Sequence, residues 1–260
     1  MPETTIFRAE RPSYDEFRRA CLDPGRPALI TGAMDQWPAM QRWSFDHVGE
    51  VLGARTITPV VLDAGNFHID VKAGVRVAEM DFATYVRHLE GSDAPPYYLR
   101  LPLEGPDAPP FEGYEVPVYC KRRIFMKKNL WVGGAGVASD LHYDMTHNVV
   151  AQVVGRRRVL LFGPEQTEDL HPFPRRTLNW HHSQVHVEAP DHARFPRYKN
   201  ARPIEVELSR GEMLFIPQGF WHRFETLERA IAVNFFWLTL RLAPAMALAR
   251  LAWVANGVRT

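Results

Sequence analysis

The second half of the chain, from residue 118 onward, constrains the fold most, because it reads almost wholly as short strands divided by glycine turns. Strands are expected over residues 124–126, 129–132, 148–154, 157–162, 204–208, 213–216 and 230–240 and around His142 and His222. Turns containing Gly133, Gly155 and Gly211 separate several of them. This spacing predicts a mainly β protein, a double-stranded β-helix of the jelly-roll or cupin kind.

Residues 1–117 read as mixed α/β structure in front of this core. Helices are expected over 13–22, with Ser13 as a cap, over 44–53, closed by Gly53, and over 80–89. Strands are expected over 27–32 and, around a turn at 63–66, within 55–72. Residues 91–117 are rich in proline and glycine and predict a loop that contains a strand-like segment at 97–100.

The alanine- and leucine-rich segment 242–254 predicts a C-terminal helix. It either packs on the core or forms the contact of a homodimer. We therefore expect one domain over 1–260, consisting of an N-terminal α/β part (1–117), a β-helix core (118–240) and a C-terminal helix (241–260).

Composition limits the classes of function. The 260 residues are 46% hydrophobic and have a net charge of +1, which argues against a strongly basic nucleic-acid binder. The two cysteines form no C-x-x-C pair, which argues against a disulfide scaffold or a cysteine zinc site. Because no signal peptide or membrane-spanning run is visible, we expect a cytoplasmic protein, or a nuclear one in a eukaryote.

A metal site is indicated by the triplet His142-Tyr143-Asp144. On a strand, residues two apart point to the same face, so the imidazole and the carboxylate lie together. His222, on a later strand, offers a second imidazole. Two histidines and one carboxylate form the facial triad of non-haem Fe(II) oxygenases. An H-x-D triplet alone is common in a chain with 11 histidines, so the surrounding residues must support this reading.

Three consecutive arginines, 156–158, follow the triplet. If a strand begins at Arg157, that residue shares a face with Val159 and Leu161, while Arg156 and Arg158 share the other. One guanidinium then points inward, where it can bind a carboxylate through two parallel hydrogen bonds. The alternative is that all three form a solvated face.

The run GGAGVASDLHYDMTHNVVAQVVGRRRVLLFGP, residues 133–164, resembles the core of the JmjC, or cupin-like, Fe(II)- and 2-oxoglutarate-dependent oxygenases. It is similar in particular to the asparaginyl hydroxylase that inhibits hypoxia-inducible factor, and to the tRNA wybutosine hydroxylases. The likeness continues at 183–185, 190–191, 194–196, 211–217, 221–222 and 233–235, and includes residues 26–43. It covers most of the chain, and several motifs agree in order.

The resemblance implies a role for each matching residue. The iron ligands are His142, Asp144 and His222; the 2-oxoglutarate pocket comprises Ser139, Tyr98, Arg157, Asn148 and Asn234. Ser139 and Tyr98 would contact the distal carboxylate of 2-oxoglutarate. The cation position falls on Arg157, where close relatives carry lysine, so the pocket must differ slightly.

Substrate recognition is expected near the polar segment 163–203, whose length inside a compact domain is usually functional. His181 and His182 stand where the asparaginyl hydroxylase has an Arg-Gln pair that holds the target amide. Arg100 is a third candidate for substrate contact. The alternative for the two histidines is a solvated loop.

The resemblance implies an enzyme that uses Fe(II), 2-oxoglutarate and O2 to hydroxylate an unactivated C–H bond of a protein or peptide side chain. The alternatives are a modified tRNA base, a small metabolite, or a metal-binding cupin without catalysis. Histone lysine demethylation is less favoured here, because no accessory zinc or reader domain is visible in the sequence.

Overall fold

The computed structural model describes residues 5–62, 66–67, 77–90, 96–121, 123–177 and 179–239. The predicted C-terminal helix, and with it the predicted dimer contact, lies outside the described residues. The same holds for most of the turn predicted at 63–66.

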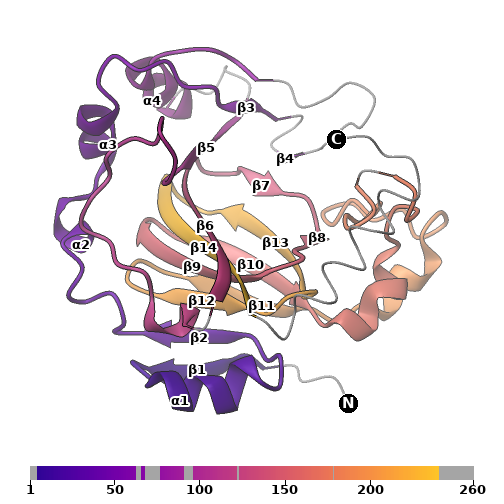
Figure 1. Cartoon of the computed structure of the whole chain (residues 1–260). Coiled ribbons are helices and arrows are strands. Elements are labelled where there is room, and N and C mark those ends of the chain that lie inside the picture. The colour runs from indigo at the N-terminus through magenta and orange to yellow at the C-terminus, as the bar shows by residue number, and fades with distance from the viewer. Residues whose placement is uncertain are drawn as a thin grey trace.

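Two sheets build the core, as the sequence predicts for a jelly roll (Figure 1). The larger sheet has eight strands in the order β1-β2-β12-β9-β14-β6-β5-β3. Their bounds are β1 Phe7–Glu10, β2 Ala28–Thr31, β12 Met213–Ile216, β9 His147–Val154, β14 Ala230–Thr239, β6 Arg123–Gly133, β5 Tyr97–Pro102 and β3 Val60–Val61. Apart from the parallel pair β1–β2, its described pairings are antiparallel.

The smaller sheet has the order β11-β10-β13-β7-β4, and β8 pairs with β13 beside this path. Its bounds are β11 Ile204–Leu208, β10 Arg157–Phe162, β13 Trp221–Thr226, β7 Ala138–Ser139, β4 Asn66–Phe67 and β8 His142–Tyr143. Most strands therefore follow the predicted ranges, but β6 is one continuous strand where two were expected, and β1 and β7 were not predicted.

Helices α1 and α3 begin where capping chemistry predicts. Helix α1 (Tyr14–Phe17) starts with a capping box in which Ser13 and Glu16 exchange hydrogen bonds, and it continues as a π-helical turn over Arg18–Leu22. Helix α3 (Phe45–Leu52) is capped by Ser44 and ends at Gly53, whose φ of 54° suits glycine. The other α-helices are α2 (Ala39–Arg42) and α4 (Phe82–Glu90).

The central strands β9, β12 and β14 of the larger sheet are buried on both faces, which explains why they are nearly continuously apolar. On one face, Val149 and Phe235 pack in a core with Phe17 and Tyr85 from the N-terminal helices. On the other, strands β9, β12 and β14 pack against the smaller sheet through residues such as Val150. Figure 1 shows α2, α3 and α4 on one side of the strands and the orange segment after β10 on the other.

The segment 163–203 contains two 3-10 turns, Pro164–Leu170 and Pro196–Asn200. Between these turns, the backbone of His182 forms an isolated β-bridge with His142, and that of Ser183 forms one with Pro172. The backbone N–H of Tyr143 donates to the carbonyl of His181 (3.0 Å). This segment therefore extends the small sheet beyond β8.

Candidate metal centre and cosubstrate pocket

The three predicted ligands converge at the end of β8. His142 lies directly opposite His222 in the pairing of β8 with β13, and Asp144 follows β8 immediately. One ligand atom from each residue lies within 4.8 Å of the others, and His222 Nε2 is 3.5 Å from Asp144 Oδ2. Asp144 was expected on the same strand as His142; it lies just past the strand end and still meets both imidazoles.

The backbone orients both imidazoles for metal binding. His142 Nδ1 lies 2.8 Å from the carbonyl oxygen of Asp140, and His222 Nδ1 lies 3.0 Å from that of Phe220. Donation from Nδ1–H to these carbonyls leaves the Nε2 lone pairs for a metal. Burial lowers the pKa of His222 to about 4, which keeps that imidazole neutral.

The donor set fits Fe(II). Asp144 Oδ2 is buried without a hydrogen-bond partner, so the carboxylate has an oxygen free for a cation. Two neutral imidazoles and one carboxylate on one side of a metal are the ligands of the non-haem iron triad.

All the other predicted site residues line one cavity of about 320 Å³ with the triad. From the larger sheet come Tyr98, Arg100, Asn148 and Asn234, and from the rest of the chain Ser139, Arg157, His181 and His182. The cavity therefore lies between the two sheets, as in a barrel whose open end holds a ligand.

Arg157 is the inward-pointing arginine of the three. It is 2% exposed, and its Nε and Nη2 are buried without a hydrogen-bond partner. Its Cζ lies 5.9 Å from the centroid of the Phe224 ring. Arg156 and Arg158 point outward and pair with glutamates. A buried, unpaired guanidinium is costly unless an anion joins it, so this side chain fits the carboxylate of a cosubstrate.

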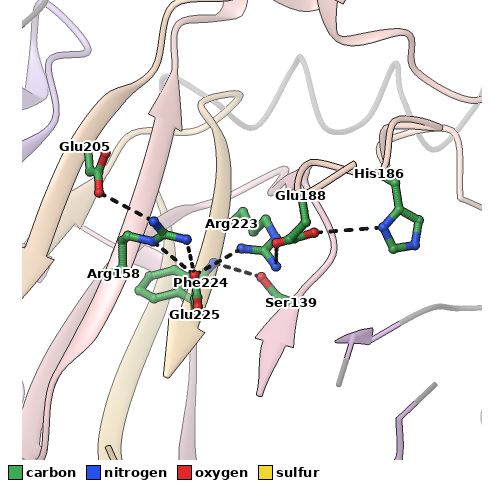
Figure 2. Close-up of polar contacts among 8 residues, drawn as sticks. All are labelled: Ser139, Arg158, His186, Glu188, Glu205, Arg223, Phe224 and Glu225. Carbon is green, nitrogen blue, oxygen red and sulfur yellow. Dashed lines mark hydrogen bonds and ion pairs between the residues drawn. The ribbon is translucent and has the colours of Figure 1, made fainter. Parts of the chain in front are cut away.

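Two hydroxyl groups lie in the same cavity. Ser139 Oγ accepts a hydrogen bond from the backbone N–H of Phe224 (3.0 Å), which leaves its own proton to donate (Figure 2). Burial raises the pKa of Tyr98, and the positive charge of Arg157 only partly opposes this, so the phenol stays protonated. Both hydroxyls can donate to the anion that Arg157 requires.

Asn234 is held by two residues that sequence reasoning missed. Its Oδ1 accepts from Asn129 Nδ2 (3.1 Å) and from Trp131 Nε1 (3.0 Å), and its Nδ2 donates to Asn148 Oδ1 (3.4 Å). Asn129 lies directly opposite Asn234 in the pairing of β6 with β14. The register of the two strands is the signal that would have identified it.

His181 and His182 are not solvated loop residues. His182 is 5% exposed, stacks on His142 with ring centroids 5.1 Å apart, and places Nδ1 3.6 Å from Asp140 Oδ2. Burial lowers the pKa of His182, and that of His181 to about 3. Both therefore form part of the cavity wall as neutral groups.

Outside the cavity, β13 carries a second feature that the sequence did not reveal. Arg223 is 4% exposed and pairs with Glu188, from the segment 163–203, and with Glu225 (3.7 Å). Figure 2 shows Glu188 between Arg223 and His186. The ion pair fastens this segment to the strand that carries His222.

A family model described as a cupin-like domain matches residues 14–241. The chain belongs to this cupin-like, JmjC-type family. It is 33% identical over 239 residues to "Lysine-specific demethylase 8" of Xenopus tropicalis, and the aligned residues cover 90% of this chain and 53% of that protein. It is 31% identical over 229 residues to "Lysine-specific demethylase JMJ30" of Arabidopsis thaliana (86% and 53%). It is 29% identical over 251 residues to "JmjC domain-containing protein D" of Dictyostelium discoideum (89% and 56%).

The chain spans about half the length of these curated relatives. The demethylases of the JmjC family use Fe(II), 2-oxoglutarate and O2, and the residues described above fit those groups. Among the described residues, no helix has the length and apolar character needed to cross a membrane.

Proposed function

We propose that this protein is a 2-oxoglutarate-dependent Fe(II) dioxygenase that hydroxylates an unactivated C–H bond of a protein or peptide side chain. One observation carries the proposal: the unpaired guanidinium of Arg157 lines the same cavity as His142, Asp144 and His222. A metal-binding cupin without catalysis has no need for that buried cation.

The metal ligands and the predicted cosubstrate residues would each have a part in this reaction. His142, Asp144 and His222 would hold Fe(II), and Arg157, Ser139 and Tyr98 would bind the distal carboxylate of 2-oxoglutarate. Bound iron supplies the activation of O2, coupled to decarboxylation of 2-oxoglutarate to succinate and CO2. Asn148 and Asn234 line the pocket and limit the water in it.

A protein substrate is supported by the relatives, two of which have names that describe lysine-specific demethylases. They lend no support to a tRNA base or a metabolite. We treat the chain as one oxygenase domain. The cysteines of the described residues, Cys21 and Cys120, are buried and free, which supports a reducing compartment such as the cytoplasm.

Demethylation is the second candidate, because the names of the relatives favour it. It would use the same site. One oxygen atom from O2 enters an N-methyl C–H bond, and the N-hydroxymethyl group then releases formaldehyde. The other oxygen atom leaves in succinate, since 2-oxoglutarate supplies two electrons.

Mass spectrometry distinguishes hydroxylation from demethylation. Peptides are incubated with the protein, Fe(II), 2-oxoglutarate and ascorbate before the measurement. Hydroxylation adds one oxygen atom to a peptide, whereas demethylation removes one methylene and releases formaldehyde. Asp144→Ala is the control, because it lacks the carboxylate of the metal site. Succinate release no greater than that of Asp144→Ala would overturn the proposed function.

A further inference from the structure

Arg100 marks the mouth of the cavity. Tyr98 and Arg100 alternate along β5 and both line the cavity, but Tyr98 is buried and Arg100 is exposed. Of the cavity-lining residues that the structure describes, Arg100 alone is classed as exposed. Arg100 therefore lies where the cavity opens to solvent, in reach of a substrate chain that enters there.

The guanidinium of Arg100 is placed over an aromatic ring. Arg100 pairs directly with Trp131 between β5 and β6, and its Cζ lies 5.9 Å from the Trp131 ring centroid. Trp131 is itself fixed by its hydrogen bond to Asn234. A methylated ammonium group would bind such an aromatic face, but here Arg100 already occupies it.

No carboxylate neutralises Arg100 within the described part of the chain, where its one charged or polar interaction is the contact with Trp131. Its N–H groups are therefore available to a ligand. A guanidinium presents these donors as a planar fork that matches a carboxylate.

The charge of the described cavity wall points the same way. Asp144 is its one acidic residue, and it belongs to the metal site. The charges of Fe(II), Asp144, Arg157 and the two carboxylates of 2-oxoglutarate cancel, so the loaded site keeps the positive charge of Arg100. A cationic methyl-lysine would meet this charge with no described carboxylate to offset it.

We propose that Arg100 determines substrate specificity by selecting peptides with a carboxylate, from aspartate or glutamate, at or beside the side chain that reacts. It disfavours methyl-lysine peptides. This inference rests on the proposed function, since it places a peptide in the cavity of the oxygenase. It separates the chain from relatives whose names describe lysine demethylation.

Binding of a randomised peptide library tests the inference without turnover. The immobilised protein carries Mn(II) and N-oxalylglycine, an unreactive analogue of 2-oxoglutarate, and the retained peptides are sequenced. Wild-type protein should enrich aspartate and glutamate about three- to tenfold over asparagine and glutamine, as expected for a partly exposed charge pair. Arg100→Gln should lose this enrichment, and Arg100→Glu should reverse it toward lysine and arginine.

Arg42→Gln is the matched control, because it removes the same charge from an exposed arginine on α2 that does not line the cavity. It should keep the wild-type preference. Enrichment of methyl-lysine peptides by the wild type, or an acidic preference that survives in Arg100→Gln, would overturn the inference.

Two further measurements distinguish failure of the inference about Arg100 from failure of the proposed function. Succinate release by the Fe(II)-loaded protein tests the oxygenase by itself. The library is also applied to metal-free protein, in which Arg100 should still select acidic peptides, because the charges of Asp144 and Arg157 then cancel and the cavity keeps the charge of Arg100. A positive succinate result without acidic selection removes only the role of Arg100.

Discussion

The two faces of β10 carry the same residue type and use it differently. On the outer face, Arg156 Nη1 lies 2.9 Å from Glu207, and Arg158 Nε lies 3.0 Å from Glu225. On the inner face, Arg157 is buried and its Nε and Nη2 have no partner in the described chain. Alternation along the chain thus separates three adjacent arginines into two that pair with glutamates at the surface and one buried cation.

The difference teaches how to read a charge run in a fold of this kind. An exposed arginine with a glutamate neighbour is accounted for by the protein itself and contributes little stability. A buried arginine with unused donors is stable only with an added anion. Changes to the inner face should therefore alter ligand binding, and changes to the outer face should alter little.

The largest effect should come from a change in the candidate metal site, which shares its cavity with Arg157. Asp144→Ala removes one of three ligands and should weaken Fe(II) binding by more than the ~10–100-fold that loss of a second-shell partner costs. Succinate production should fall to background. Calorimetric titration with Fe(II) under anaerobic conditions and a succinate assay check this. Full turnover in this variant would place the metal elsewhere.

His147 is also a buried basic residue, but it avoids the cost of a buried positive charge because it stays unprotonated. Its Nδ1 accepts a hydrogen bond from the backbone N–H of Gln218 (3.2 Å), and burial lowers its pKa to about 4 from 6.5. Above pH 6.5 it is neutral in both the folded and unfolded states. As the pH falls from 6.5 to 4, the unfolded chain takes up a proton that the folded state refuses, so stability falls by about 3 kcal/mol.

His147→Asn keeps an acceptor for Gln218 and should abolish this part of the pH dependence. Urea unfolding of metal-free wild type and variant at pH 7 and pH 4.5 measures the difference. Other buried histidines also titrate, so the variant is compared with the wild type at each pH. Equal losses of stability in both proteins would show that His147 is protonated when folded.

Arg157→Met against Arg158→Met tests the comparison directly. Loss of the inner cation should raise the KM for 2-oxoglutarate tenfold or more, because about 1.5–3 kcal/mol of charge-assisted hydrogen bonding is removed. Loss of the outer cation should leave this KM within about twofold. Steady-state succinate kinetics at varied 2-oxoglutarate measure both. A similar KM for the two variants would break the distinction between the faces.

The smallest effect should be the stability cost of the outer pair. Arg158 is half-exposed, and Arg158→Met removes its ion pair with Glu225 (2.5 Å). The free energy of unfolding should fall by less than about 1 kcal/mol, since solvent screens this pair. Thermal unfolding at low and high salt checks it. A loss above about 2 kcal/mol would mean that the outer face also has a structural role.

Local signals in the sequence predicted much of this structure. Ser13 and Ser44 cap the starts of α1 and α3, and Gly53 ends α3, as their capping chemistry predicts. The period of two along β10 correctly placed Arg157 inside. These features depend only on near neighbours in the chain.

Other features depend on contacts that the sequence order hides. Asn129 and Trp131 meet Asn234 only because β6 and β14 pair in one register. Arg223 meets Glu188 across 35 residues, and no local pattern indicates their pairing. The resemblance to a family suggested roles for the pocket residues, which stay predictions, and the departure at His181 and His182 left the identity of the substrate open.

The two-residue strand β8 is supported on both sides, by β13 and by the backbone of residues 181–183, with Ser183 N–H donating to Leu141 (2.8 Å). The segment 163–203, where we expect substrate recognition, thus shares hydrogen bonds with the strand that presents His142. We therefore expect peptide binding and metal binding to be linked. If a peptide on this segment tightens metal binding, the metal strengthens peptide binding by the same factor.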